Sequence, residues 1–184
     1  APKKRWEKCP KCQARMRKEN LKDEHELQSW FIRRIEKFLN AKGRRLIGWD
    51  EILEGGLAPN ATVMSWRGEE GGIKALKAGH DVVFAPNKHT YFDYYQTSDQ
   101  LSHPVCIGGC LTLENVYAYN PAPKGLSKRE HAHILGAQGQ LWTEYMPTPK
   151  HVEFMAFPRM CALSEVLWSP EENRDFKSFT NSLE

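Results

Sequence analysis

The chain has 184 residues, of which 40% are hydrophobic and 27% are charged, with a formal net charge of +3. This composition excludes a disordered segment, and the absence of any run of about 18 apolar residues excludes a membrane-spanning helix. Residues 1–45 contain 15 Lys/Arg against 6 Asp/Glu, whereas residues 46–184 contain 11 against 17. A basic N-terminal part is typical of a nucleic-acid-binding arm or of a solvated helix surface, and we favour the second interpretation.

The first predicted element is an amphipathic helix over residues 23–42. Its apolar residues recur at helical spacing and would form one stripe, which consists of Leu27, Trp30, Phe31, Ile35, Phe38 and Leu39. Asp23 and Glu26 fit an N-terminal capping box, and Gly43 fits the end of the helix. We therefore expect one face of this helix to pack on the core.

Short apolar runs that alternate with helices follow this helix. Strands are predicted over residues 45–49, 61–66, 81–86 and 133–139, a small helix over 73–78, an irregular stretch over 87–133, and a last helix over 150–168 that Pro158 kinks. The alternation predicts the α/β class with parallel strands, arranged either as half of an eight-stranded barrel or as an open four-stranded sheet.

Aromatic residues and carboxylates follow the predicted strands, at the ends where β/α folds bind ligands. The four segments are Trp49-Asp50-Glu51, Trp66-Arg67-Gly68, Tyr91-Phe92-Asp93 and Trp142-Thr143-Glu144. Aromatic rings pack against the C–H faces of sugars, and carboxylates accept hydrogen bonds from sugar hydroxyls. The pattern favours a carbohydrate site, and the alternative is that the Trp side chains belong to the core.

Several of these segments resemble glycoside hydrolase family 20, the β-N-acetylhexosaminidases, and they occur in the family's order over nearly the whole chain. The resemblance is carried by Gly48–Glu51, Val63–Gly68, Ala85-Pro86 with Tyr91–Gln96, Gly136–Glu144, Pro158–Met160 and Ala162–Ser169. It implies that residues 1–184 form one partial catalytic domain. This domain would be the second half of a (β/α)8 TIM barrel, with about four parallel strands and flanking helices.

The resemblance also implies a retaining reaction in which the substrate's own 2-acetamido oxygen attacks the anomeric carbon, so that the protein supplies no nucleophile. The substrates would be glycans that end in β-linked N-acetylglucosamine or N-acetylgalactosamine, with no cofactor and no metal. By position, Trp49, Trp66 and Trp142 would enclose the acetamido group, Tyr91 would donate a hydrogen bond to its oxygen, and Asp93 and Glu144 would bind the outer hydroxyls. Asp50 and Glu51 would have supporting roles.

One motif of the family does not occur in the chain. The family's catalytic Asp-Glu pair lies in a His-x-Gly-Gly-Asp-Glu motif, and no Gly-Gly-Asp-Glu is present in the 184 residues. Residues 1–6 resemble the sequence that immediately follows this pair. We therefore expect that the chain is inactive alone. Its expected partner is the N-terminal half of the barrel, which these residues lack. The chain's first and last strands would have unpaired edges that favour self-association.

The family implies a periplasmic or secreted location, without a membrane or nucleic-acid partner. Two alternatives remain open: a non-catalytic sugar-binding α/β module, and a zinc-dependent nucleic-acid-binding protein. The second rests on Cys9-Pro10-Lys11-Cys12, which is half of a zinc knuckle, with Cys106, Cys110 and His103 as the remaining candidate ligands. Without zinc, Cys9 and Cys12 would be free or locally bridged thiols on a loop.

Overall fold

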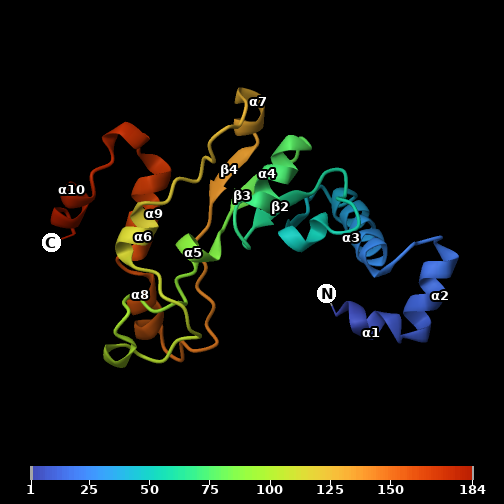
Figure 1. Ribbon diagram of the computed structural model, residues 1–184, viewed down its shortest axis with the longest axis horizontal. Coiled ribbons are helices and arrows are strands. Elements are labelled where there is room, and N and C mark those ends of the chain that lie inside the picture. The colour runs from blue at the N-terminus through green and yellow to red at the C-terminus, as the bar shows by residue number, and fades with distance from the viewer. Residues whose placement is uncertain (1, 184) are drawn as a thin grey trace.

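The structure is a computed structural model that describes residues 2–183. A small sheet lies in the middle of the molecule, with the N-terminal helices on one side and the C-terminal helices on the other (Figure 1). The helices are α1 Lys3–Glu7, α2 Pro10–Lys18, α3 Glu24–Asn40, α4 Glu70–Lys77, α5 Asn87–Thr90, α6 Leu113–Tyr117, α7 Lys128–His131, α8 Pro149–Ala156, α9 Arg159–Trp168 and α10 Phe176–Asn181, with 3-10 helices at Asp50–Leu53, Gln100–Ser102 and Glu171–Asn173.

The four strands are β1 Ile47–Trp49, β2 Thr62–Ser65, β3 Val82–Phe84 and β4 Ile134–Ala137. They are all parallel and lie in the order β1-β2-β3-β4, which confirms the predicted parallel β/α arrangement. Each strand is shorter than predicted, because pairing ends within three or four residues. A single parallel bridge between Tyr91 and Gln140 continues the contact of the two segments that follow β3 and β4.

Apolar side chains from β2 and β3 pack under α4 and form one part of the core. Val63, Val82 and Phe84 are fully buried there together with Ala75 and Leu76 of α4. The helix can approach this closely only because residue 72 is glycine: a Cβ atom on it would lie 2.5 Å from the Phe84 ring. A second cluster joins α6, α9 and α10 beside the sheet.

Helix α3 begins where the sequence predicts, since the Asp23 carboxylate accepts a hydrogen bond of 2.9 Å from the Glu26 amide. The predicted packing face, however, is partly wrong. Leu27 is buried, but Phe31, Ile35 and Phe38 are exposed. The helix instead buries part of its polar side against the loop after β1.

Three polar contacts hold this buried side of α3. Gln28 donates 2.6 Å to the Glu51 carbonyl, Ser29 donates to the Gly56 carbonyl, and Glu36 accepts 2.7 Å from the Asn60 amide. Each contact satisfies a backbone group of an irregular segment. Periodicity alone cannot reveal such contacts, because it ranks positions by hydropathy.

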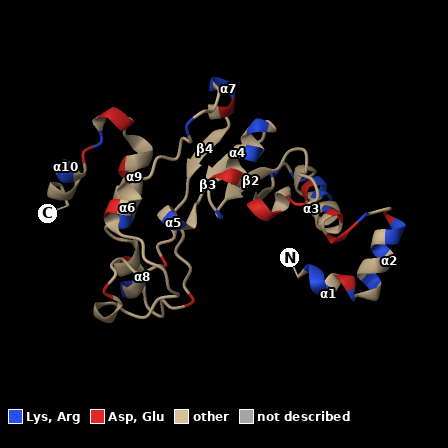
Figure 2. Ribbon diagram, in the orientation of Figure 1, with Lys and Arg blue, Asp and Glu red and all other residues tan. Residues whose placement is uncertain are grey.

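Other segments also differ from expectation. The stretch over 87–133 contains α5, α6 and α7, and the predicted kinked helix over 150–168 is two helices that are separated at Phe157 and Pro158. The basic N-terminal residues form α1 and α2, and Lys and Arg are spread over α1, α2 and α3 (Figure 2). No helix within residues 2–183 has both the length and the apolar composition needed to cross a bilayer.

Arg159 joins the loop after β3 to the C-terminal helices. Its guanidinium is fully buried and donates to four backbone carbonyls, which are those of Phe92 (2.6 Å), Tyr94 (3.0 Å), Leu111 (3.0 Å) and Met155 (2.7 Å). Burial lowers the pKa of Arg159 to about 10, so the side chain stays protonated at neutral pH. The loop that carries Tyr91 and Asp93 is thereby fixed to α8 and α9.

Replacing Arg159 by Met should destabilise the fold, because four buried carbonyls would lose their donor. We expect the free energy of unfolding in urea to fall by about 3 kcal/mol, and by less for Arg159→Lys, which keeps a charge but not the planar donor set. Arg129→Met, on the exposed side of α7, is the matched control. Equal unfolding midpoints for Arg159→Met and the control would show that this contact is not needed.

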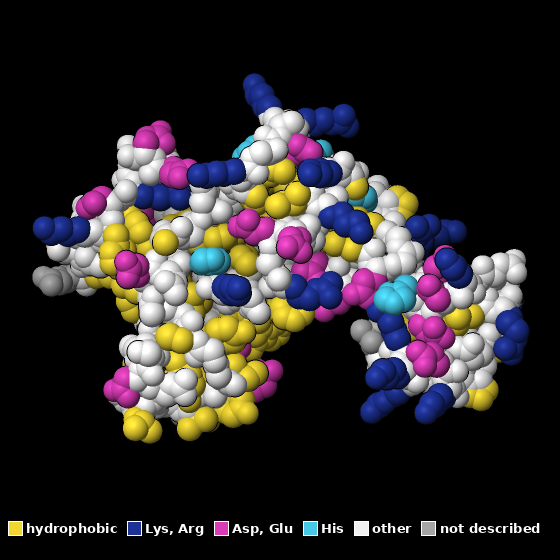
Figure 3. All heavy atoms as spheres, viewed as in Figure 1, with side chains coloured by type: hydrophobic (Ala, Val, Ile, Leu, Met, Phe, Trp, Pro, Cys, Tyr) yellow, Lys and Arg dark blue, Asp and Glu magenta, His cyan; other side chains and the backbone are white. Residues whose placement is uncertain are grey.

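The two outer strands of the sheet have free edges among the described residues, because β1 pairs only with β2 and β4 only with β3. Ile47 on β1 is 54% exposed and Leu135 on β4 is 57% exposed. Hydrophobic side chains also gather over the loop between α5 and α6 and around α8 (Figure 3). Free edges beside apolar surface favour association with another chain.

We therefore expect the 184-residue chain to self-associate at micromolar concentration, as measured by light scattering. The double variant Ile47→Lys/Leu135→Lys should shift the population towards monomer, because charges on edge strands oppose pairing. Asn181→Lys, at an exposed position at the end of α10 and outside the sheet, should leave the distribution unchanged. A monodisperse wild-type monomer with one sharp unfolding transition would contradict this prediction.

Candidate functional site

Four aromatic rings converge at the carboxyl ends of the strands. Trp49, the last residue of β1, and Trp142 after β4 have ring centroids 5.9 Å apart at 44°. Trp66 after β2 stacks on Tyr91 at 6.3 Å and 26°. The Trp142 side chain is a hydrogen-bonding partner of the Tyr91 phenol, which connects the two pairs. The sequence expectation that three Trp side chains and Tyr91 lie together thus matches the structure, whereas their roles toward a ligand stay predictions.

The Tyr91 phenol is mostly buried in this cluster. Burial raises its pKa to about 12, and the hydrogen bond from Trp142 opposes this rise only in part. The phenol therefore stays protonated over the whole neutral range. It can donate a hydrogen bond to a ligand oxygen without competing ionisation.

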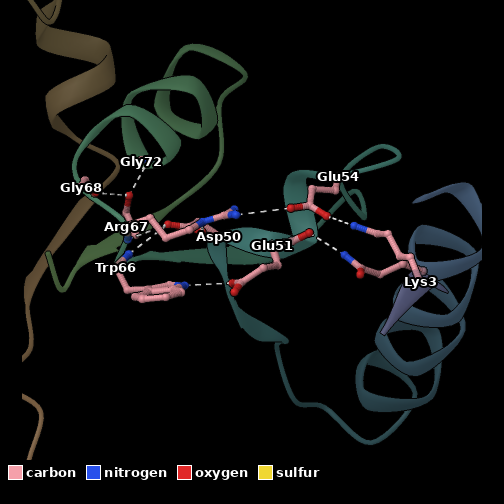
Figure 4. A network of polar contacts seen from close by, with 10 residues as sticks. Lys3, Asp50, Glu51, Glu54, Trp66, Arg67, Gly68 and Gly72 are labelled. Atoms are coloured by element: carbon pink, nitrogen blue, oxygen red, sulfur yellow. Dashed lines mark hydrogen bonds and ion pairs between the residues drawn. The ribbon is translucent and has the colours of Figure 1, made fainter. Parts of the chain in front are cut away.

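Asp50 fixes the end of β2 to the end of β1 (Figure 4). Its buried carboxylate accepts hydrogen bonds from the backbone amides of Trp66 (3.0 Å) and Arg67 (3.1 Å) and from Arg67 Nε (2.6 Å). Glu51 accepts 3.0 Å from the indole nitrogen of Trp66. Both acidic residues therefore orient Trp66, which agrees with the supporting roles expected from the sequence.

Glu54 extends this network to the N-terminal helices. Its carboxylate contacts Arg67 Nη1 at 3.4 Å, His25 Nδ1 at 3.5 Å and the Lys3 ammonium. These contacts hold the pKa of Glu54 below its usual range, with the Lys3 hydrogen bond as the largest cause. Sequence reasoning missed this network because Lys3 and Glu54 lie far apart in the chain.

Asp93 is the second buried acid of the site, with 4% of its surface exposed. Its Oδ1 atom has no hydrogen-bond partner among the described residues. Burial raises the pKa of Asp93 to about 6, the nearby charge of Glu144 adds to this, and Arg159 opposes it. An unpaired buried carboxylate oxygen with a raised pKa is typical of a ligand-binding or catalytic position.

Asp93 borders a narrow crevice that Trp142, Tyr145 and Met146 also line and that is too tight to admit a water molecule. Trp142, which belongs to both this crevice and the aromatic cluster, is 41% exposed. Glu144 lies on the exposed loop after β4. The predicted substrate-binding residues thus lie at or after the carboxyl ends of the four strands, and their contacts with a substrate stay predictions.

Two further residues shape the site without a clear sequence signal. Tyr94 packs on Tyr91 at 5.7 Å, and Gly109 leaves room for the Tyr94 ring, since a Cβ atom there would lie 2.5 Å from it. Gln140 is buried beside Tyr91, where it forms the bridge described above. The only hint for Tyr94 was its place in the aromatic run that starts at Tyr91.

The ligands proposed for a zinc knuckle do not meet. Residues 2–183 contain no group of three or more His, Cys, Asp or Glu side chains arranged to hold a metal ion. Cys106 is buried next to Met155, with 3.8 Å between the two sulfur atoms, and Cys110 is exposed. Cys9 and Cys12 lie at the start of α2, which corrects the expectation that, without zinc, they would be thiols on a loop.

Comparisons with known proteins identify the family of the chain. The family model "Glycosyl hydrolase family 20, catalytic domain" matches residues 1–171. A beta-hexosaminidase of Porphyromonas gingivalis is 54% identical over the whole chain, and one of Akkermansia muciniphila is 32% identical. The chain spans 24% and 37% of the lengths of these two relatives.

Solved structures have the same fold over nearly the whole chain. The exo β-N-acetylglucosaminidase of Vibrio harveyi in complex with N-acetylglucosamine superposes on 97% of this chain and 28% of its own, with a TM-score of 0.85 and 32% identity. Because the family model and these relatives cover almost every residue described above, the chain belongs to glycosyl hydrolase family 20 and forms a four-stranded portion of its TIM-barrel catalytic domain.

Proposed function

We propose that this chain is the C-terminal half of the catalytic barrel of a β-N-acetylhexosaminidase, which removes terminal N-acetylglucosamine or N-acetylgalactosamine from β-glycosides. The observation that carries the proposal is the convergence of Trp49, Trp66, Trp142 and Tyr91 at one edge of the sheet. Three indoles and one protonated phenol suit a planar, partly apolar acetamido group. The relatives' names support this choice of substrate.

In the proposed reaction the acetamido oxygen of the substrate attacks the anomeric carbon of the same sugar. The indoles hold the acetamido group folded under the ring, which makes the attack intramolecular and removes entropy from the barrier. The Tyr91 phenol donates to the acetamido oxygen as its charge changes. Asp93, with its unpaired Oδ1, and Glu144 accept hydrogen bonds from the outer hydroxyls.

The proposed reaction also needs a general acid, and the two acidic residues at the end of β1, Asp50 and Glu51, are not free to take that place. Asp50 and Glu51 are both engaged with Trp66, and Asp50 also binds Arg67. We expect the acid and the remaining strands of the barrel to come from polypeptide outside these residues, which would pair with the free edges of β1 and β4. A periplasmic or secreted location, inferred from the family, is part of the same proposal.

The activity is best tested in a chimera. The segment of the Porphyromonas gingivalis relative that matches this chain over its full length would be replaced by the 184 residues. We expect the chimera to hydrolyse an aryl N-acetyl-β-glucosaminide and the isolated chain to show no turnover, because general acid–base groups typically contribute about 10²–10⁴-fold. Sugar binding by the chimera without turnover would favour the non-catalytic sugar-binding module instead.

Within the chimera, Trp142→Ala should lower kcat/KM by about 10²-fold or more, because the acetamido group would lose one wall of its pocket. Trp168→Ala is the matched control, since Trp168 is 89% exposed at the end of α9. The control should keep nearly full activity. If both variants keep full activity, the aromatic cluster does not form the substrate pocket.

Asp93 should make stability depend on pH in an unusual direction. Its pKa of about 6 in the folded chain is above the ordinary value near 3.9, so the folded state binds the proton more tightly. Protonated Asp93 therefore contributes to the free energy of unfolding. This contribution is fully present below about pH 4, and about 2–3 kcal/mol of it is lost as the pH rises through 6.

Asp93→Asn should remove this loss, which urea unfolding of the chain at pH 4 and pH 7 would measure. Asp99→Asn, at an exposed position of the same loop region, is the control and should keep the wild-type difference between the two pH values. If the free energy of unfolding of Asp93→Asn differs between pH 4 and pH 7 as much as that of the wild type, the Asp93 carboxylate is not desolvated in the folded chain.

A further inference from the structure

We propose that Cys9 and Cys12 form a reversible dithiol–disulfide site that exchanges with small anionic disulfides of the glutathione type. The site is separate from the sugar-binding edge of the sheet and does not depend on the proposed hydrolase activity. It lies at the start of α2, on the N-terminal side of the molecule (Figure 1).

The first argument is the geometry of the two thiols. Cys9 is the N-cap residue of the nine-residue helix α2, and its Sγ accepts a hydrogen bond of 3.4 Å from the Cys12 amide. Pro10 occupies the first helical position, where its fixed φ favours the helix start. One turn of helix thus holds both side chains at the same helix end.

The second argument is that the two thiols are chemically unequal. The hydrogen bond from the Cys12 thiol is the largest cause that lowers the pKa of Cys9, followed by the Cys12 amide, and the charge of Lys11 also contributes. The same contact raises the pKa of Cys12. Since the thiolate is the nucleophile in disulfide exchange, Cys9 is the attacking thiol and Cys12 the resolving one.

The third argument is access and charge. Both thiols are partly exposed, whereas Cys106 is buried. A groove of about 420 Å³, lined mainly by apolar side chains that include Trp6, Trp30 and Phe31, reaches Cys12, with Lys11 and Arg15 at its border. Lys8 adds a further positive charge next to Cys9 in the sequence. Basic side chains around an accessible thiol attract an anionic disulfide.

The exchange balances in two steps. The Cys9 thiolate attacks one sulfur of oxidised glutathione, which forms a mixed disulfide and releases one glutathione thiolate. Cys12 then loses its proton and attacks the Cys9 sulfur, which forms the Cys9–Cys12 bond and releases the second glutathione thiolate, and each released thiolate takes up a proton. Two protein thiols are oxidised to one disulfide while one glutathione disulfide is reduced to two thiols.

The product can be identified by peptide mapping. The native 184-residue chain would be incubated with oxidised glutathione at neutral pH, quenched with acid, alkylated and digested with trypsin. Because cleavage follows Lys8, Lys11 and Arg15, the disulfide joins the peptide 9–11 to the peptide 12–15. We expect this linked pair as the main oxidised product, and reduction by dithiothreitol should separate it. The proposal would be overturned if Cys9 and Cys12 both stayed reduced, or if they remained as stable mixed disulfides with glutathione.

A reactivity measurement tests the geometry independently. At neutral pH, iodoacetamide should modify Cys9 of the native chain about fivefold to tenfold faster than the exposed Cys110, and this difference should vanish in concentrated urea. Cys12→Ala should reduce the advantage of Cys9 and trap its mixed disulfide with glutathione, whereas Cys110→Ser should change neither. Equal native rates for Cys9 and Cys110 would also overturn the proposal.

Discussion

The buried guanidinium of Arg159 is the interaction on which the largest part of the molecule depends. The loop after β3 is long and irregular, and a buried loop needs partners for its backbone carbonyls. Arg159 supplies four donors to carbonyls from three different segments, which places the loop carrying Tyr91 and Asp93 against α8 and α9. The same positive charge opposes the rise in the pKa of Asp93 and thereby links the fold to the chemistry of the site.

Asp50 has the corresponding role on the other side of the sheet. Strands of three or four residues have too few ladder hydrogen bonds to orient the side chains that follow them. The Asp50 carboxylate therefore fixes Trp66 and Arg67 through their backbone amides, and Glu51 fixes the Trp66 indole. Two buried charged residues, one basic and one acidic, thus position the aromatic rings that the parallel strands bring to a common edge.

The N-terminal helices combine two features that the sugar site does not use. Lys and Arg residues recur along these helices (Figure 2), and the pair Cys9 and Cys12 lies at the start of α2 among them. The contact between Lys3 and Glu54 connects α1 to the acidic network that ends at Trp66. This contact therefore joins the N-terminal helices, which include the proposed thiol site, to the 3-10 helix after β1.

By itself, the sequence determined the class of fold, the four strands and the residues at their carboxyl ends. Both the alternation of short apolar runs with helices and the order of the aromatic residues can be read from local sequence; these residues are Trp49, Trp66, Tyr91 and Trp142. Tertiary structure alone decided which face of α3 is buried, that Phe31 and Phe38 are exposed, and that Arg159 contacts Phe92, Tyr94 and Leu111. These features depend on hydrogen-bond partners that lie far away in the chain. Periodicity reports only hydropathy and cannot show where a distant carbonyl or carboxylate will lie.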